Sequence, residues 1–245
     1  MKAMILAAGL GTRLRPLTND RPKALVEIAG RTLLEITLAR LRSVGIHDVI
    51  VNVHHFADKV AAYLDSHHRF GMHVEISREE ILLDTGGGLK KAASFFRDSS
   101  EPFLLHNVDV LSSIDLARMV QFHKEHLALA TLAVQERKTS RYLLFDDSAQ
   151  LCGRRAGLDG QSEMARSSPS VHALAFSGIH VISSRLPDLL TEEGVFPIVP
   201  AYLRLVSQGE KIVGFRADEY YWRDLGKPEN IRQAEEDMEA GVIVQ

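Results

Sequence analysis

Short apolar runs alternate with amphipathic segments along most of the chain. Apolar runs predict strands over 3–8, 49–53, 74–76, 102–106 and 130–134. Apolar residues at helical spacing predict helices over 33–44, 56–64, 86–96 and 114–126, and Gly45 is the expected C-cap of the first. This alternation predicts an α/β fold with a mostly parallel, Rossmann-like sheet and helices on both faces.

The pattern changes after Val134. Residues 140–160 contain short extended pieces separated by turn residues, and 160–170 are polar. The run 173–182 then predicts a strong central strand. We interpret this second half as a smaller mixed portion that covers one end of the sheet, within one compact unit spanning 1–245.

Composition narrows the class of protein further. The 245 residues are 45% hydrophobic and 25% charged, with a net charge of −3, which gives no reason to expect nucleic acid as a partner. The first apolar run is too short for a signal peptide, and we expect no membrane partner and a cytoplasmic protein. Cys152 is the only cysteine, which excludes a disulfide framework and a thiol metal site.

The first strand runs directly into a glycine-rich loop, Gly9-Leu10-Gly11-Thr12-Arg13-Leu14-Arg15-Pro16-Leu17-Thr18, and Arg21-Pro22-Lys23 follows. Glycines let backbone N–H groups approach an anion, and Arg13, Arg15 and Lys23 add positive charge. The loop is not a Walker loop, because Thr12-Arg13 stands where Lys-Ser/Thr would be required. It also lacks the third glycine of the dinucleotide fingerprint. The pattern indicates a cradle for a polyphosphate.

Two aspartates occur where a ligand of an open α/β sheet would bind. Asp109 follows a buried strand, and Asp224 lies in Trp222-Arg223-Asp224-Leu225-Gly226 before a C-terminal helix. Mg²⁺ usually takes one or two carboxylates together with phosphate oxygens and water, so the two aspartates are a candidate Mg²⁺ pair. The histidine pairs at 54–55, 67–68 and 123/126 have no third ligand of matching context, and we expect them at the surface.

These motifs together resemble the sugar-1-phosphate nucleotidylyltransferase family, also called nucleotide-sugar pyrophosphorylases. The likeness is carried by G-x-G-x-R-x-x-P-L-T, R-P-K, L-D-T-G-G-G and F-S-G-I, and it covers nearly the whole chain. It implies transfer of a nucleotidyl group from an NTP to a sugar 1-phosphate, with release of pyrophosphate. It also divides the chain into a nucleotide-binding part, 1–135, and a sugar-phosphate-binding part, 136–245.

The resemblance assigns roles to particular residues. Arg13 and Lys23 would be catalytic cations, and Asp109 and Asp224 would be catalytic metal ligands for Mg²⁺. The remaining nucleotide-binding residues would be Leu6, Ala8, Gly9, Gly11, Thr12, Glu79, Thr85, Gly86, Gly87 and Asn107. The sugar-phosphate-binding residues would be Tyr142, Ser177, Gly178 and Arg141.

Two departures from the family pattern stand out. The family commonly has glycine before the first aspartate, and this chain has Val108. The E-K-P segment of longer members, whose lysine binds the sugar phosphate, is missing, and Arg166 or Arg141 are the candidate substitutes.

The nucleobase is expected against the Gly86-Gly87-Gly88 loop, near Glu79. A carboxylate only accepts hydrogen bonds, so Glu79 would suit uracil or guanine; the alternative is a solvated acidic pair, Glu79-Glu80. The chain is most similar to the short bacterial members, which favours UTP with N-acetylmuramate 1-phosphate, with GTP and mannose 1-phosphate as the alternative. A cytidylyltransferase or a non-catalytic nucleotide sensor, and a monomer or a homodimer, stay open.

Overall fold

The structure, a computed structural model, describes residues 1–243. The α-helices in this range are α1 (Leu33–Ser43), α2 (Ala57–Ser66), α3 (Asp84–Lys91), α4 (Leu116–His126), α5 (Ile198–Ser207) and α6 (Pro228–Glu239). The strands are β1 (Lys2–Leu6), β2 (Glu27–Ile28), β3 (Arg31–Thr32), β4 (Asp48–Val53), β5 (His73–Arg78), β6 (Phe103–Asn107), β7 (Val110–Ser112), β8 (Ala130–Gln135), β9 (Arg141–Phe145), β10 (Leu151–Ala156), β11 (Ser162–Met164), β12 (His172–Ile182), β13 (Ile212–Arg216) and β14 (Trp222–Asp224).

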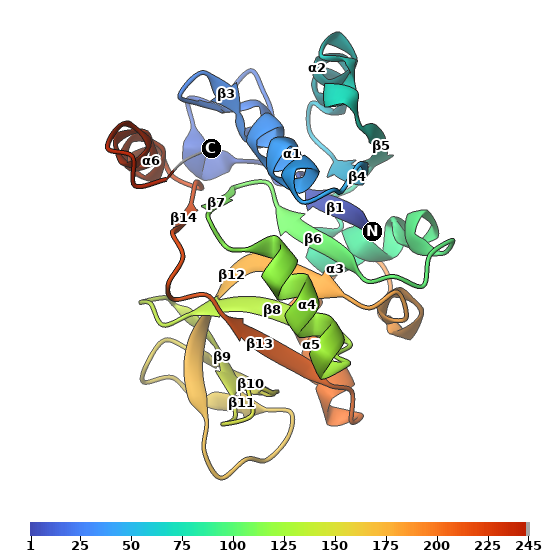
Figure 1. Cartoon of the computed structure of the whole chain (residues 1–245), viewed down its shortest axis with the longest axis vertical. Helices are drawn as coiled ribbons and strands as arrows, with labels where there is room; N and C mark the ends of the chain where they lie inside the picture. Colours follow the sequence, from blue (N-terminus) through green and yellow to red (C-terminus); the bar gives the residue numbers. More distant parts are fainter. Residues whose placement is uncertain (244–245) are drawn as a thin grey trace.

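One large sheet runs through both halves of the described chain, in the order β11-β10-β9-β12-β6-β1-β4-β5, with β8 and β13 branching from β12. The β6-β1-β4-β5 portion is parallel, as is the β8–β13 pair. Strand β12 is antiparallel to β6, β8 and β9. The predicted α/β class, with a mostly parallel sheet and a smaller mixed portion, is therefore confirmed, and Figure 1 shows the parallel strands β4, β1 and β6 above the antiparallel strands β12, β9 and β10.

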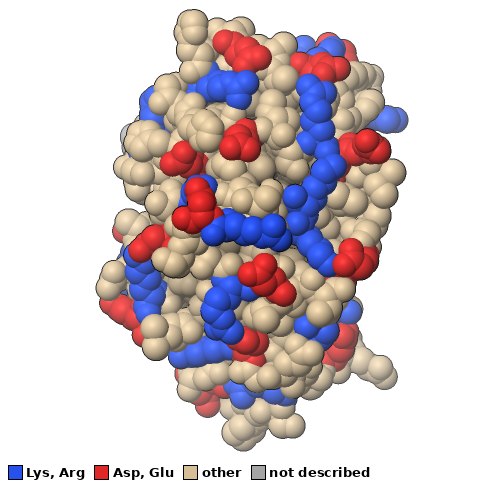
Figure 2. Space-filling view, turned by 90° about the vertical axis from the view of Figure 1, so that its right-hand side faces the viewer, with Lys and Arg blue, Asp and Glu red and all other residues tan. Residues whose placement is uncertain are grey.

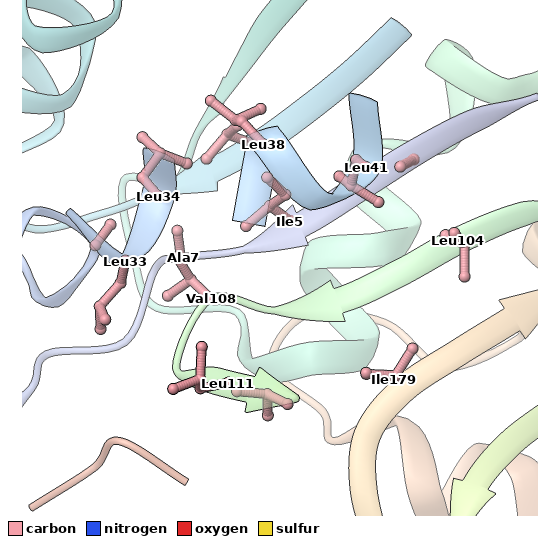
Figure 3. Packing of buried hydrophobic residues seen from close by; sticks show 14 of the residues in the cluster. Ile5, Ala7, Leu33, Leu34, Leu38, Leu41, Leu104, Val108, Leu111 and Ile179 are labelled. Carbon is pink, nitrogen blue, oxygen red and sulfur yellow. The ribbon is translucent and has the colours of Figure 1, made fainter. Parts of the chain in front are cut away.

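Helix α1 shows how the sequence fixes its own elements. The Thr32 side chain caps the helix by accepting a hydrogen bond from Glu35 N at 3.1 Å, and Gly45 ends it with a φ of +78°. Its buried leucines lie over Ile5 of β1 (Figure 3), and Leu38 and Leu41 are fully buried. Burying a leucine completely stabilises by about 1.5–3 kcal/mol, so this face holds the helix on the sheet.

All four predicted helices are present with shifted bounds: 33–44 is α1 (Leu33–Ser43), 56–64 is α2 (Ala57–Ser66), and the other two differ as follows. The helix expected over 114–126 starts at Leu116, because the Asp115 side chain accepts from Arg118 N and acts as the N-cap. The helix expected over 86–96 begins earlier, at Asp84, and ends at Lys91, after which a short 3-10 helix follows. Within residues 1–243, no helix is both long and apolar enough to cross a bilayer.

A small two-stranded sheet joins distant parts of the chain beside the large one. Strand β14 pairs antiparallel with β7, which places Asp224 opposite Val110, the residue after Asp109. On the face shown in Figure 2, Lys and Arg side chains form narrow stripes with Asp and Glu beside them, not a broad basic patch.

Candidate active site

A cavity of about 350 Å³ opens at the carboxyl ends of β1 and β6. This is the edge at which open α/β sheets bind ligands. Its lining comes from the glycine loop, the ends of β4 and β6, and the two segments around α3 and Val195: Leu6, Ala7, Ala8, Gly9, Lys23, Asn52, Leu82, Asp84, Thr85, Asn107, Val108, Asp109 and Val195.

Lys23 and Asp109 meet in this cavity as an ion pair. Lys23 lies in a 3-10 helix, Lys23–Leu25, and is 8% exposed. Asp109 is fixed by its backbone, since its carbonyl accepts from Leu225 N at 2.7 Å. That bond and the β7–β14 pairing hold Asp109 and Asp224 on adjoining segments. The structure thus brings together two predicted aspartates that lie 115 positions apart in the sequence.

Arg13, from the glycine loop, lies close to Asp224 on the segment that adjoins Asp109, and neither Arg13 nor Asp224 is among the residues that line the cavity. A Cβ added to Gly226 would lie 2.7 Å from both Arg13 Nη2 and Asp224 Oδ1. Asp224 Oδ1 also accepts from Gly226 N at 3.1 Å. Gly226 therefore leaves the space in which a guanidinium and a carboxylate approach one another, a role that the W-x-D-L-G pattern did not reveal.

Asn52 is a site residue that the sequence analysis missed. It lines the cavity and is 2% exposed, and its Oδ1 accepts from Ala7 N at 2.7 Å while its Nδ2 donates to Glu79 Oε1 at 2.7 Å. The other Glu79 oxygen accepts from Leu83 N at 2.9 Å. A polar residue inside the apolar run 49–53 was the available signal.

Glu79 is placed differently from the expectation. Its side chain is 5% exposed, it does not line the cavity, and both of its oxygens accept from protein donors. Glu79 is therefore not part of a solvated acidic pair with Glu80. Its two carboxylate oxygens already accept hydrogen bonds within the protein and do not face the cavity in which the nucleobase is expected. Glu79 instead supports Asn52, which in turn holds the start of the glycine loop.

The glycines at 86–88 also serve a different purpose from the expected one. A Cβ at Gly86 would lie 2.3 Å from the Phe196 ring, one at Gly87 would lie 2.5 Å from Gly194 O, and one at Gly88 would lie 2.8 Å from both Asn52 Nδ2 and Glu79 Oε1. The N–H groups of Gly86 and Gly87 both donate to Phe196 O. The space beside each glycine of the triplet is filled by protein atoms, and the N–H groups of Gly86 and Gly87 are taken up by Phe196 O.

Of the other predicted nucleotide-binding residues, five line the cavity and two do not. Gly11, with a φ of +65°, packs against Thr18 and Lys23 and shapes the loop, and Thr12 is exposed beside it. Those in the lining are Leu6, Ala8, Gly9, Thr85 and Asn107.

The residues predicted to bind the sugar phosphate are buried or hydrogen-bonded to other parts of the protein. Ser177 is fully buried, and its carbonyl accepts from Trp222 Nε1 at 2.8 Å. Gly178 has a φ of +75°, and a Cβ there would lie 2.9 Å from Asn107 Nδ2, so the glycine permits the irregularity at which β12 changes register against β8. The hydroxyl of Tyr142, which is 5% exposed, accepts from Thr139 N at 3.3 Å.

The two arginines considered as substitutes for the missing lysine differ from each other. Arg166 is ion-paired with Asp146 and donates to Leu151 O, so it is committed to the β10 hairpin. Arg141 is exposed at the start of β9.

Not all of the histidines lie at the surface. His123 is 4% exposed and hydrogen-bonds Thr131 at 3.0 Å, and burial lowers its pKa to about 4. His106 and His180, on β6 and β12, are also buried. Burial lowers the pKa of His106 to about 4 and that of His180 to about 3. Among the described residues, no three His, Cys, Asp or Glu side chains form a metal cluster.

Comparison with known proteins shows the family of this chain. The model of the nucleotidyl transferase family matches residues 2–144, and the chain belongs to that family. The N-acetylmuramate alpha-1-phosphate uridylyltransferase of Caulobacter vibrioides is 33% identical over 238 residues, which cover 93% of this chain and 92% of that protein.

Other relatives are longer or more distant. The mannose-1-phosphate guanylyltransferase of Mycobacterium tuberculosis is 30% identical over 247 residues, and the match spans 98% of this chain and 65% of that protein. The crystal structure of HddC from Yersinia pseudotuberculosis complexed with GMP-PN superposes with a TM-score of 0.76 at 21% identity. It covers 97% of this chain and 99% of that one, which confirms the fold.

Proposed function

We propose that this enzyme transfers a nucleotidyl group from an NTP to a sugar 1-phosphate and releases pyrophosphate. The observation that carries the proposal is the Lys23–Asp109 ion pair in the cavity beside the glycine loop, with Asp224 and Arg13 close to Gly226 on the segment that adjoins Asp109. The attacking group is a phosphate oxygen that is ionised at neutral pH, so the reaction needs no general base. Alignment and charge neutralisation are sufficient, as in other phosphoryl-type transfers.

The donor set of Asp109 and Asp224 fits Mg²⁺. Both are half-buried carboxylates on adjoining segments, and a Mg²⁺ ion held by two carboxylates completes its coordination with phosphate oxygens and water. When bound, the ion would neutralise charge on the reacting phosphates. Lys23 would turn from Asp109 to the nucleotide phosphates, and Arg13 would neutralise the departing pyrophosphate.

We propose UTP and N-acetylmuramate 1-phosphate as the substrates, with GTP and mannose 1-phosphate as the alternative. The support is the likeness to the Caulobacter enzyme over nearly the full length of both chains. The guanylyltransferase likeness keeps the alternative open. The argument from Glu79 no longer contributes, because its carboxylate accepts from Asn52 and Leu83.

The test is a matrix of UTP, GTP, CTP and ATP against a panel of sugar 1-phosphates, with pyrophosphate release as the readout. We expect one combination to exceed the others by orders of magnitude, and the Asp109→Asn variant serves as the inactive control. Absence of pyrophosphate release in every combination, from a protein shown to be folded, would contradict the proposed function.

A further inference from the structure

Arg137, at the end of β8, is a half-buried cation that the proposed chemistry has not used. Its guanidinium carbon lies 3.6 Å from the centroid of the Trp222 ring. Its Nη2 donates to Phe176 O at 2.7 Å, and its Nε is buried without a hydrogen-bond partner. Within residues 1–243, no carboxylate oxygen comes within 4.0 Å of this guanidinium. A desolvated charge with an unused donor is costly unless an anion completes it.

The surroundings of Arg137 are built to hold it in place. Arg137 and Trp222 are both hydrogen-bonded to successive carbonyls of β12. Phe176 O accepts from Arg137, and Ser177 O accepts from the indole Nε1 of Trp222. These carbonyls stand where β12 changes register against β8, next to Gly178. The F-S-G-I motif therefore fixes a stacked arginine–tryptophan pair.

This pair lies beside the reacting centre. Trp222 is two residues before Asp224 on β14, and the charge of Asp224 acts on Arg137, partly offsetting the effect of burial, which lowers the pKa of the guanidinium. Asp224 therefore lies near two arginines. Arg13 approaches it beside Gly226, and Arg137 stacks on Trp222, two residues earlier on the same strand. Neither Arg137 nor Trp222 lines the nucleotide cavity, so this cation belongs to the neighbouring part of the site.

Arg155, on β10, also has a buried Nε without a hydrogen-bond partner, and its guanidinium carbon lies 6.0 Å from the centroid of the Tyr142 ring. An anion seated at Arg137 would contact a planar guanidinium group, which suits phosphate oxygens better than an ammonium does.

We infer that Arg137 binds the phosphate of the acceptor sugar 1-phosphate and takes the place of the lysine that the E-K-P segment supplies in longer relatives. The inference rests on the proposed function, because the acceptor phosphate is the anion that must be brought to Asp224. It assigns this role to neither Arg141, which is exposed, nor Arg166, which is paired with Asp146.

The test compares Arg137→Met and Arg137→Lys with Lys138→Gln as the matched control, because Lys138 is an exposed cation next to Arg137. With the substrates found in the turnover matrix, we expect Arg137→Met to raise the KM for the sugar 1-phosphate by about 100-fold, with the KM for the NTP within about twofold of wild type. Arg137→Lys keeps the charge and should recover part of that loss. Lys138→Gln should leave both KM values unchanged.

Trp222 is the only tryptophan of the chain, so its fluorescence gives a binding readout independent of turnover. Titration with the sugar 1-phosphate, and with inorganic phosphate, should change its emission in wild type and Lys138→Gln but not in Arg137→Met. If folded Arg137→Met and Arg137→Lys keep the wild-type acceptor KM and fluorescence titration, the inference is overturned. An inactive wild type would overturn the proposed function instead.

Discussion

Asn52 and Glu79 form a buried amide–carboxylate pair beside the glycine loop. Exchanging the amide and the carboxylate between these two positions should show that the pair organises the loop by its hydrogen bonds. In the wild type, three bonds form a chain: Ala7 N to Asn52, Asn52 to Glu79, and Leu83 N to Glu79. In Glu79→Gln, one amide hydrogen must face another donor whichever way the new side chain turns. In Asn52→Asp, two carboxylates face each other at the former 2.7 Å contact. In the double variant Asn52→Asp/Glu79→Gln, all three bonds can form with the middle donor reversed.

The magnitudes follow from the burial of the pair. Glu79→Gln leaves buried donors unsatisfied and should cost about 2 kcal/mol of unfolding free energy. Asn52→Asp places an unpaired charge in a buried site and should cost about 3 kcal/mol at neutral pH. If the two losses added, the double variant would lose about 5 kcal/mol, enough to unfold a protein of ordinary stability. Reciprocal pairing predicts instead that the double variant lies within about 1 kcal/mol of wild type.

Urea unfolding of the four proteins, followed by circular dichroism, gives the coupling energy as a double-mutant cycle. The deficit of Asn52→Asp should grow as the pH rises. In the folded Asn52→Asp variant, the repulsion between the two carboxylates raises the pKa of one of them, which therefore holds a proton at lower pH. Raising the pH removes that proton and restores the repulsion. Additive losses in the cycle would refute the hydrogen-bond chain. An unchanged Glu79→Gln variant would show that Glu79 is not committed to Asn52 and Leu83.

Three further outcomes are expected. Asp109→Asn and Asp224→Asn should each abolish Mg²⁺-dependent turnover while the fold stays intact, because an amide cannot replace an anionic ligand. A variant that keeps the full rate at ordinary Mg²⁺ concentration would show that the aspartate it replaces is only structural. Gly226→Ala should lower kcat by about 100-fold with little change in melting temperature, because the new methyl group displaces Arg13 or Asp224 from one another. Stability should fall by about 1.4 kcal/mol per pH unit for each of His106 and His180 as the pH drops from about 6.5 toward 4. Their folded pKa values lie below the unfolded ones, and so the unfolded state binds the proton first. The His180→Gln variant should take up one proton fewer on unfolding, which reduces the pH dependence of its unfolding free energy. Calorimetry at several pH values measures this difference.

The fold was predictable because local patterns dictate it. The runs that form β1, β4, β6 and β8 are mostly apolar, as expected for strands buried on both faces, and the structure brings Lys23 and Asp109 together with Asp224 on an adjoining strand. Their roles in binding and catalysis stay predictions. The roles of the glycine triplet and of Glu79 could not be predicted in the same way. The space beside Gly86 is filled by Phe196, 110 positions later, and no local pattern carries that contact.

Arg137 illustrates the same limit. In the sequence it is one of several basic residues that follow β8, between Glu136 and Lys138. Its importance depends on stacking with Trp222 and on a carbonyl of β12, both of which come from elements formed much later in the chain. Side chains that act through tertiary contacts of this kind become visible only when the elements are assembled.

The antiparallel pairing of β12 with β6 has a mechanical consequence. The register from Ile179↔His106 to Ile182↔Phe103 joins the two halves of the chain by a ladder of main-chain hydrogen bonds. The halves cannot swing apart as two lobes about a hinge without breaking that ladder. Movement during a catalytic cycle must therefore come from loops and side chains at the edge of the sheet, such as Arg13 and Lys23. Under the proposed function, the framework would set the spacing between the nucleotide cavity and Arg137, so discrimination among acceptors would depend on side chains and not on closure of the two halves.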